Sequence, residues 1–361
     1  MATISYQEEV QRAEALLRDA EYDAARIAFE NAINLKPNSP SAAAGLAKVL
    51  LVQGAFVDAK KLYGAAFNNG LEKSAEHLTN LAICCALNGE QKNARTLLEG
   101  AISVDASYRP AYGALAKHCV VMGDYVAAER YASEGLRIFP NDLPCFEARS
   151  LARVSVRNFD GSYADAEEAL KLNARSVDGM LCKASVLATR GDLTKAKALL
   201  ENALQIEPAN IEVILTLGNV CQIEGDTEKA EACFQNGLNL HPLDWRVYYF
   251  LALLDLLKSR FAEGLSHVDK AIQLQDVPFL HCVRGNLLVK LGRLDEAKME
   301  FTIAATTNPS DVYSLIGLAE IESQNPAERS QAVEHAKRVL SLDQKGAPAE
   351  RARQLLKSLT A

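Results

Sequence analysis

Two segments of the chain, TLGNVCQIEGDTEKAEACFQNGLNLHP (216–242) and VRGNLLVKLGRLDEAKMEFTIAATTNP (283–309), carry the pattern that decides the fold. Each segment ends in a proline, and prolines recur at similar intervals along the chain. Pro208 and Pro242, for example, are 34 residues apart. A period of this length indicates a repeat protein, in which each unit packs only on its neighbours.

Aligning the chain on its prolines divides it into ten units. They start at Tyr6, Pro40, Ala75, Arg109, Leu143, Val177, Ile211, Trp245, Pro278 and Val312. The eighth position is small in every unit: Ala13, Ala47, Ala82, Ala116, Ser150, Ala184, Gly218, Ala252, Gly285 and Ala319. The twentieth is also small: Ala25, Ala59, Ala94, Ala128, Ser162, Ala196, Ala230, Gly264, Ala297 and, after one inserted residue, Ala332. Two helices can approach closely only where the side chains between them are small, so these columns predict paired antiparallel helices.

Larger apolar residues surround the small ones at helical spacing. In the seventh unit, Ile214, Leu217 and Cys221 form a stripe on the first predicted helix, and Phe234 and Leu238 continue one on the second. Six glycines fall at the turn between the paired helices, where a left-handed residue ends the first helix. They are Gly54, Gly89, Gly123, Gly191, Gly225 and Gly292. The prolines end the second helix and lead into the next unit.

The segments 216–242 and 283–309 resemble tetratricopeptide repeats, and the pattern covers about residues 6–344 as an array of about ten repeats. The resemblance implies an all-α, right-handed solenoid whose concave face is lined by the first helix of each repeat. It does not specify a function, because repeats of this family bind very different partners. Residues 345–361 are expected to form a polar-faced capping helix, which would argue against continuation into another domain.

Repeats five and ten depart from the pattern. Repeat five has Arg157 where glycine is usual and Gly161 at the expected start of its second helix, which predicts an irregular turn. Repeat ten has Pro326 at its turn and one extra residue.

Composition and charge exclude several classes of function. The chain has 361 residues, 49% of them hydrophobic, and a formal net charge of -7, so it lacks the basic surface of a nucleic-acid binder. The first nine residues lack the basic and apolar regions of a secretory signal. The most apolar stretch, residues 247–257, contains Asp255 and is too short to span a bilayer. We therefore expect a cytoplasmic protein without direct membrane insertion.

The sequence carries no pattern typical of a catalytic or metal-binding site. The six histidines are scattered over different repeats, and no Cys-x-x-Cys pair or Gly-rich phosphate loop is present. The eight cysteines are expected to be reduced thiols that serve as small core residues. The sequence thus predicts no enzyme activity, no cofactor and no metal.

Arg149, Arg153 and Arg157 are spaced four residues apart on a predicted helix. One interpretation is an anion-binding stripe for a phosphate or an acidic peptide. The alternative is that their stems pack on the helix surface while their charged ends lie in solvent near Glu147, Glu167 or Glu168.

By resemblance, positions 2, 5, 9, 12 and 13 of each repeat face the groove. Some family members hold a C-terminal carboxylate there with a Lys/Asn clamp. The matching positions here are Val10, Glu14, Gly45, Glu76 and Asn80, so we do not expect that clamp.

A groove strip remains in repeats seven to nine as the expected partner-binding site. It consists of Leu215, Asn219, Gln222, Tyr249, Leu253, Leu256, Asn286 and Val289. Apolar surface with a few amide groups is what a peptide-binding groove requires, and Trp245, Tyr248 and Phe250 add aromatic residues typical of binding hot spots. The alternative is that the first helix of repeat eight is simply buried.

The leading hypothesis is a scaffold or adaptor that holds a peptide or helical segment of a protein partner in its groove, as a monomer or a weak homo-oligomer. One alternative is a chaperone or assembly factor for a secretion, pilus or envelope system. Another is the repeat region of an enzyme such as a glycosyltransferase whose catalytic domain lies elsewhere.

Overall fold

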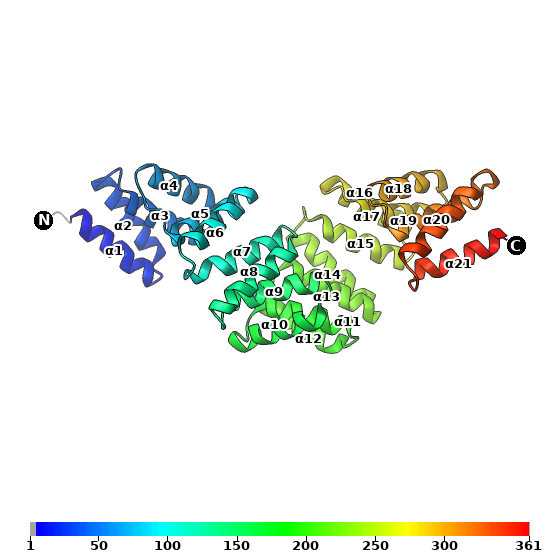
Figure 1. Ribbon diagram of the computed structural model, residues 1–361, viewed down its shortest axis with the longest axis horizontal. Coiled ribbons are helices and arrows are strands. Elements are labelled where there is room, and N and C mark those ends of the chain that lie inside the picture. Colours follow the sequence, from blue (N-terminus) through cyan, green and yellow to red (C-terminus); the bar gives the residue numbers. More distant parts are fainter. Residues whose placement is uncertain (1–4, 361) are drawn as a thin grey trace. The chain divides into compact units, whose positions relative to one another are not determined.

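The computed structural model describes residues 5–360, and within this range the chain forms α-helices, one 3₁₀ helix and no strand (Figure 1). The chain divides into two compact units, Met1–Arg190 and Gly191–Ala361. Unit 1 contains α1 (Tyr6–Arg18), α2 (Tyr22–Leu35), α3 (Pro40–Val52), α4 (Phe56–Asn68), α5 (Ala75–Leu87), α6 (Gln91–Val104), α7 (Arg109–Val121), α8 (Tyr125–Ile138), α9 (Leu143–Ser155), α10 (Phe159–Leu172) and α11 (Val177–Thr189). Unit 2 contains α12 (Leu193–Ile206), α13 (Ile211–Glu224), α14 (Thr227–Leu240), α15 (Trp245–Leu257), α16 (Phe261–Leu274), α17 (Pro278–Lys290), α18 (Leu294–Thr307), α19 (Val312–Glu322), η1 (Pro326–Glu328), α20 (Arg329–Leu342) and α21 (Ala347–Thr360).

The odd-numbered helices from α1 to α19 begin at the ten residues that the proline alignment predicted as repeat starts. Most of these starts follow a polar residue whose side chain accepts a hydrogen bond from the first turn. Ser5, Ser39 and Ser74 do this for α1, α3 and α5, and such a cap satisfies backbone N–H groups that have no partner inside the helix. The prediction of an all-α solenoid of helix pairs is therefore confirmed.

The turn between paired helices uses one left-handed residue. The six glycines named above have φ between 73° and 90° there. In repeats one, five and eight the same place is taken by Ala20, Arg157 and Ser259, with φ of 61°, 62° and 59°. Arg157 thus adopts the backbone of the glycine it replaces, so the expectation of an irregular turn in repeat five was wrong. In repeat ten the turn is instead the 3₁₀ helix η1.

The small-residue columns lie where the two helices of a repeat meet, and their alanines are buried. The column glycines show why size matters. A Cβ on Gly218 would lie 2.3 Å from a ring carbon of Phe234, and one on Gly285 would lie 2.7 Å from Phe301. The aromatic ring of the second helix thus fills the space that the missing side chain leaves.

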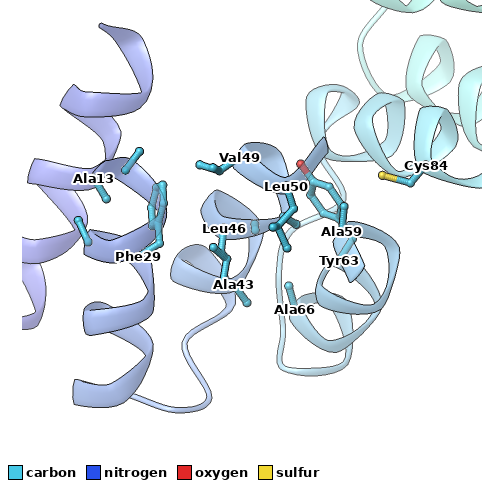
Figure 2. Packing of buried hydrophobic residues seen from close by; sticks show 14 residues of the cluster. Ala13, Phe29, Ala43, Leu46, Val49, Leu50, Ala59, Tyr63, Ala66 and Cys84 are labelled. Atoms are coloured by element: carbon cyan, nitrogen blue, oxygen red, sulfur yellow. The ribbon is translucent and has the colours of Figure 1, made fainter. Parts of the chain in front are cut away.

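Repeats one and two show an apolar core of this kind (Figure 2). Phe29 of α2 and Tyr63 of α4 are both buried, and Leu46, Val49 and Leu50 of α3 lie between them. Phe29 also packs over the next repeat, since a Cβ on Gly45 would lie 2.2 Å from its ring. Burial of these side chains gives the array its nearest-neighbour stability.

At the end of unit 2, α21 packs on α19 and α20. Its Ala349 and Ala352 are buried, and Leu355 packs against the cluster that contains Ile316 and Val339. Arg351 donates to Glu320 of α19 at 2.7 Å.

Candidate functional site

The groove strip lies on the first helices of repeats seven, eight and nine, namely α13, α15 and α17 of unit 2, and each of these helices packs on the next. Tyr249, Leu253 and Leu256 of α15 are half-buried and pack against the core cluster of repeat eight. Val289 of α17 is 36% exposed. The structure therefore brings the predicted side chains onto neighbouring helices, with part of their apolar surface open to solvent.

The structure differs from the predicted strip at one residue, Leu215. It is only 4% exposed, so it belongs to the core between helices and not to the open part of the strip. The reason is that Leu215 lies at the fifth position of a helix whose third, fourth and seventh positions are also buried, so this part of α13 is enclosed by its neighbours.

The three amide side chains of the strip, Asn219, Gln222 and Asn286, are half-buried. Asn286 donates to the backbone carbonyl oxygen of Cys282 at 3.0 Å, which uses its N–H₂ and leaves its oxygen available. The buried Oε1 of Gln222 has no hydrogen-bond partner among residues 5–360. A buried acceptor without a donor is costly.

A chain of aromatic rings crosses the strip. Phe234 stacks on Phe250 at 5.2 Å between ring centroids, and Phe250 meets Tyr249 edge to face at 5.2 Å. Tyr249 contacts Phe279 at 5.2 Å, and Phe279 contacts Trp245 at 5.6 Å. These distances and tilts are those of favourable aromatic pairs. Burial also raises the pKa of the Tyr249 hydroxyl.

Phe279 was missed by the sequence analysis, although it is 42% exposed and completes this chain of rings. Its place at the second position of repeat nine is one of the groove-facing positions, and this could have identified it. Tyr248, by contrast, has other contacts. Its hydroxyl donates to the carbonyl of Pro242, and its ring lies beside His267.

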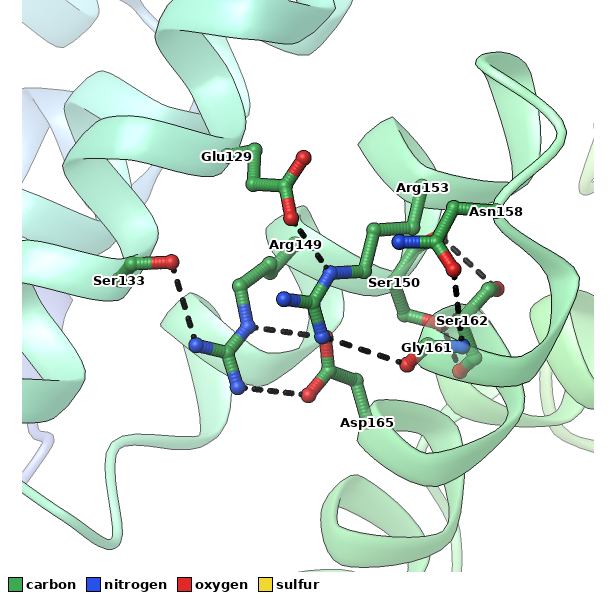
Figure 3. Close-up of polar contacts among 9 residues, drawn as sticks. All are labelled: Glu129, Ser133, Arg149, Ser150, Arg153, Asn158, Gly161, Ser162 and Asp165. Carbon is green, nitrogen blue, oxygen red and sulfur yellow. Dashed lines mark hydrogen bonds and ion pairs between the residues drawn. The ribbon is translucent and has the colours of Figure 1, made fainter.

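The arginine stripe of repeat five is a structural cross-link (Figure 3). Arg149 binds both carboxylate oxygens of Asp165, at 2.9 and 2.7 Å, and Arg153 binds the same carboxylate at 2.9 Å. Arg153 also donates to Glu129 of α8 at 2.7 Å. Because Asp165 is 3% exposed, both guanidinium groups are engaged inside the protein rather than offered to an anion.

Neither detailed interpretation of the stripe was correct. Arg157 does not share the helix face, because α9 ends at Ser155 and Arg157 takes the left-handed turn position. The carboxylates near the other two arginines are not the expected ones either. Glu147 pairs with Lys117, and Glu167 pairs with Lys183.

Unit 1 contains a cavity of about 710 Å³ that the sequence analysis did not predict. It is lined by Glu14, Leu17, Arg18, Tyr22, Phe29, Ser41, Ala44, Gly45, Lys48, Val52, Tyr63, Leu71, Glu76, His77 and Asn80. Four of the five positions matched to the carboxylate clamp lie here, but Val10 does not. Lys48 is held by Glu76 at 2.5 Å, so its charge is already partnered.

Two hydrogen-bonding atoms of this cavity have no partner in the described part of the chain. They are the Tyr63 hydroxyl and the Asn80 side-chain nitrogen. Burial raises the pKa of Tyr63, which keeps its hydroxyl protonated. The interaction of the Tyr63 hydroxyl with Asn80 acts in the opposite direction on this pKa, so these two side chains lie close to each other.

Carboxylates, imidazoles and thiols are the side chains that bind metals or act as nucleophiles. Between residues 5 and 360, no group of three His, Cys, Asp or Glu side chains is placed to hold a metal ion. Burial raises the pKa of Cys84, Cys233 and Cys282 to about 11, so these thiols are protonated at neutral pH and are poor nucleophiles. No helix among the described residues is both long and apolar enough to cross a bilayer.

Comparison with known proteins identifies the repeat. Tetratricopeptide repeat models match residues 10–67 and residues 187–254. No curated protein matches the chain in sequence.

Solved structures with the same fold span most of the chain. Yeast Tom70 is 13% identical and has a TM-score of 0.53, with 98% of this chain and 95% of Tom70 covered. The APC/C hetero-tetramer Cut9–Hcn1 is 13% identical with a TM-score of 0.56, covering 97% and 95%. A tetratricopeptide repeat protein from Parabacteroides merdae is 15% identical with a TM-score of 0.53, covering 68% and 98%. At these identities the likeness concerns the fold alone.

Proposed function

We propose that this chain, which is a tetratricopeptide repeat protein of about ten repeats, is a non-catalytic scaffold or adaptor for protein partners. It holds a peptide or helical segment of its partner against the groove strip in repeats seven to nine. The observation that carries the proposal is the chain of aromatic rings, in which Phe279, 42% exposed, links Tyr249 to Trp245.

The chemistry of the strip suits a protein segment. Half-exposed apolar and aromatic side chains provide the desolvated anchors that dominate binding energy. The side-chain oxygen of Asn286 provides an acceptor for a directed hydrogen bond. A helix or an extended peptide with apolar side chains fits these requirements.

The proposal extends to the setting in which the protein acts. We place it in the cytoplasm, as a monomer or a weak homo-oligomer, with no cofactor. The net charge of -7 supports a partner other than nucleic acid.

Leu253→Lys tests the proposal. Leu253 is half-buried in the cluster of repeat eight, so its replacement by lysine puts a charge in the strip while the long side chain can still reach solvent. We expect partner affinity to fall by at least about tenfold, since loss of one apolar anchor costs about 1.4 kcal/mol or more. Affinity capture from the native cell with mass spectrometry identifies the partner, and titration with the purified partner measures the loss.

Val126→Lys is the matched control, because Val126 is 78% exposed on α8 of unit 1 and far from the strip in sequence. It should leave partner affinity and helicity unchanged. Normal affinity of Leu253→Lys would place the site elsewhere, and unfolding of that variant would assign Leu253 to the core. Turnover of a small molecule by the purified chain would refute the non-catalytic part of the proposal.

A further inference from the structure

His281 is a buried histidine at a core position of repeat nine. It is the fourth residue of that repeat, and the fourth residues of repeats seven and ten are the buried apolar side chains Ile214 and Leu315. His281 is 8% exposed. A buried imidazole at this place needs partners for both of its nitrogens.

Both partners are carboxylates. Nδ1 of His281 lies 2.7 Å from Oε2 of Glu300 on α18, and Nε2 lies 2.8 Å from Oδ1 of Asp276 in the loop between α16 and α17. An ionised carboxylate only accepts hydrogen bonds, so both ring nitrogens must carry a proton to satisfy both contacts. The geometry therefore selects the doubly protonated, positively charged ring.

The surrounding charges favour the same form. Glu300 is 6% exposed and also accepts from Arg284 at 2.6 Å, and Arg284 donates to Asp269 of α16 at 2.7 Å. The network thus contains three carboxylates and one permanent cation. Although burial opposes the charged ring, the hydrogen bonds that the ring donates to Glu300 and Asp276 raise the pKa of His281.

We propose that charged His281 clamps α17 to α18 and to the loop that follows α16, and that this clamp loosens as the pH rises. Because α17 also carries Phe279, Asn286 and Val289, release of the clamp would disturb the groove strip; this consequence rests on the proposed function. The clamp would make partner binding weaker at alkaline pH, although His281 does not itself touch the partner.

The direction of the pH effect follows from the raised pKa. A histidine that is easier to protonate in the folded state than in the unfolded chain stabilises the fold below the ordinary histidine value of about 6.5. That stabilisation is lost as the pH rises through the folded value. In neutral His281, one nitrogen presents a lone pair to a carboxylate, which replaces a hydrogen bond by repulsion.

Two measurements test the clamp without any partner. The first is an NMR titration of the His281 ring in the full chain, with His335 as internal reference because only its Nδ1 has a described carboxylate partner, Glu322. We expect the midpoint of His281 to lie above about 6.5. The second is amide hydrogen exchange between pH 6 and pH 9, with rates corrected for base catalysis. Protection of α17 relative to α13 is expected to fall by at least about threefold over this range in the wild type.

His281→Gln should abolish this pH dependence, because glutamine does not titrate, whereas His335→Gln should leave it in place. A His281 midpoint at or below about 6.5 would overturn the proposal, as would the same pH-dependent fall in His281→Gln. If His281→Gln fails to fold, the ring titration of the wild type still decides. Since neither readout involves a partner, a negative result here is separate from a failure of the groove strip.

Discussion

Repeats two and five of unit 1 differ at three equivalent positions of the helix hairpin. The side chains there are apolar in repeat two and charged in repeat five. In repeat two, the seventh, eleventh and twenty-third positions hold Leu46, Leu50 and Leu62. Leu46 and Leu50 belong to the apolar core of Figure 2, and Leu62 is partly buried against that core. In repeat five, the same positions hold Arg149, Arg153 and Asp165, which form the ion network of Figure 3.

The place where the two helices cross differs in the same way. Ala47 and Ala59 of repeat two correspond to Ser150 and Ser162 of repeat five. Each serine hydroxyl donates to the backbone carbonyl of the other residue, at 2.8 and 2.9 Å. The comparison teaches that the hairpin requires small side chains at the crossing, but accepts either apolar or polar neighbours as long as the polar ones satisfy each other.

The largest loss in the free energy of unfolding is expected from Asp165→Ala in repeat five. It leaves Arg149 and Arg153, whose side chains are only 17% and 20% exposed, without their shared carboxylate. Removing one partner of a buried ion pair typically costs about 3–5 kcal/mol, and urea unfolding followed by circular dichroism measures the loss.

The triple variant R149L/R153L/D165L is the control, since it gives repeat five the three leucines of repeat two. An apolar replacement of a buried ionic cluster is commonly neutral or stabilising, so the triple variant should be more stable than Asp165→Ala. If it is no more stable, the two repeats are not interchangeable in the way that the comparison states.

A smaller effect is expected in repeat two from Gly45→Ala. The new Cβ would lie 2.2 Å from the ring of Phe29, and overpacking of this kind costs about 1–3 kcal/mol. In Gly161→Ala of repeat five, the new Cβ would meet the amide of Asn158 at 2.9 Å and Cδ of Arg153 at 3.1 Å, which are contacts less close than that of Gly45 with Phe29. It should change the free energy of unfolding by less than about 0.5 kcal/mol, the usual scale of surface substitutions. Equal losses in the two variants, measured by the same urea unfolding, would show that Phe29 moves away easily.

The smallest change in stability is expected from substitutions at the turns between paired helices. Arg157 has φ of 62° where repeat two has Gly54 with φ of 80°, and a left-handed backbone costs a non-glycine residue about 1–2 kcal/mol. Arg157→Gly should therefore stabilise the chain by about 0.5–1 kcal/mol after the greater entropy of unfolded glycine is deducted. Gly54→Arg should destabilise it by a similar amount, and thermal unfolding of the two variants measures both shifts. A loss of stability in Arg157→Gly would mean that the arginine side chain makes a contact worth more than the backbone strain.

The candidate sites could be predicted only in part, and particular residues show why. The aligned groove positions predicted that Tyr249, Leu253 and Val289 lie on neighbouring helices, because the repeat period determines which positions lie side by side. They did not show that Leu215 is enclosed, because exposure depends on the neighbouring helices and not on the column alone. Phe279 stands at a groove-facing position and Asn80 at a position matched to the carboxylate clamp, but the ring contacts of the one and the cavity around the other require coordinates.

The sequence by itself determined the repeat architecture, including all ten starts of the first helices and the small residues at each crossing. It could do so because each repeat folds from contacts within one period and with its neighbours, so its pattern is local and recurs. The tertiary structure alone decided which charges meet. Asp165 lies 12 and 16 residues from the arginines it binds, and His281 lies 19 residues from Glu300. Partner choice among several nearby carboxylates depends on side-chain direction and distance, which periodicity does not specify.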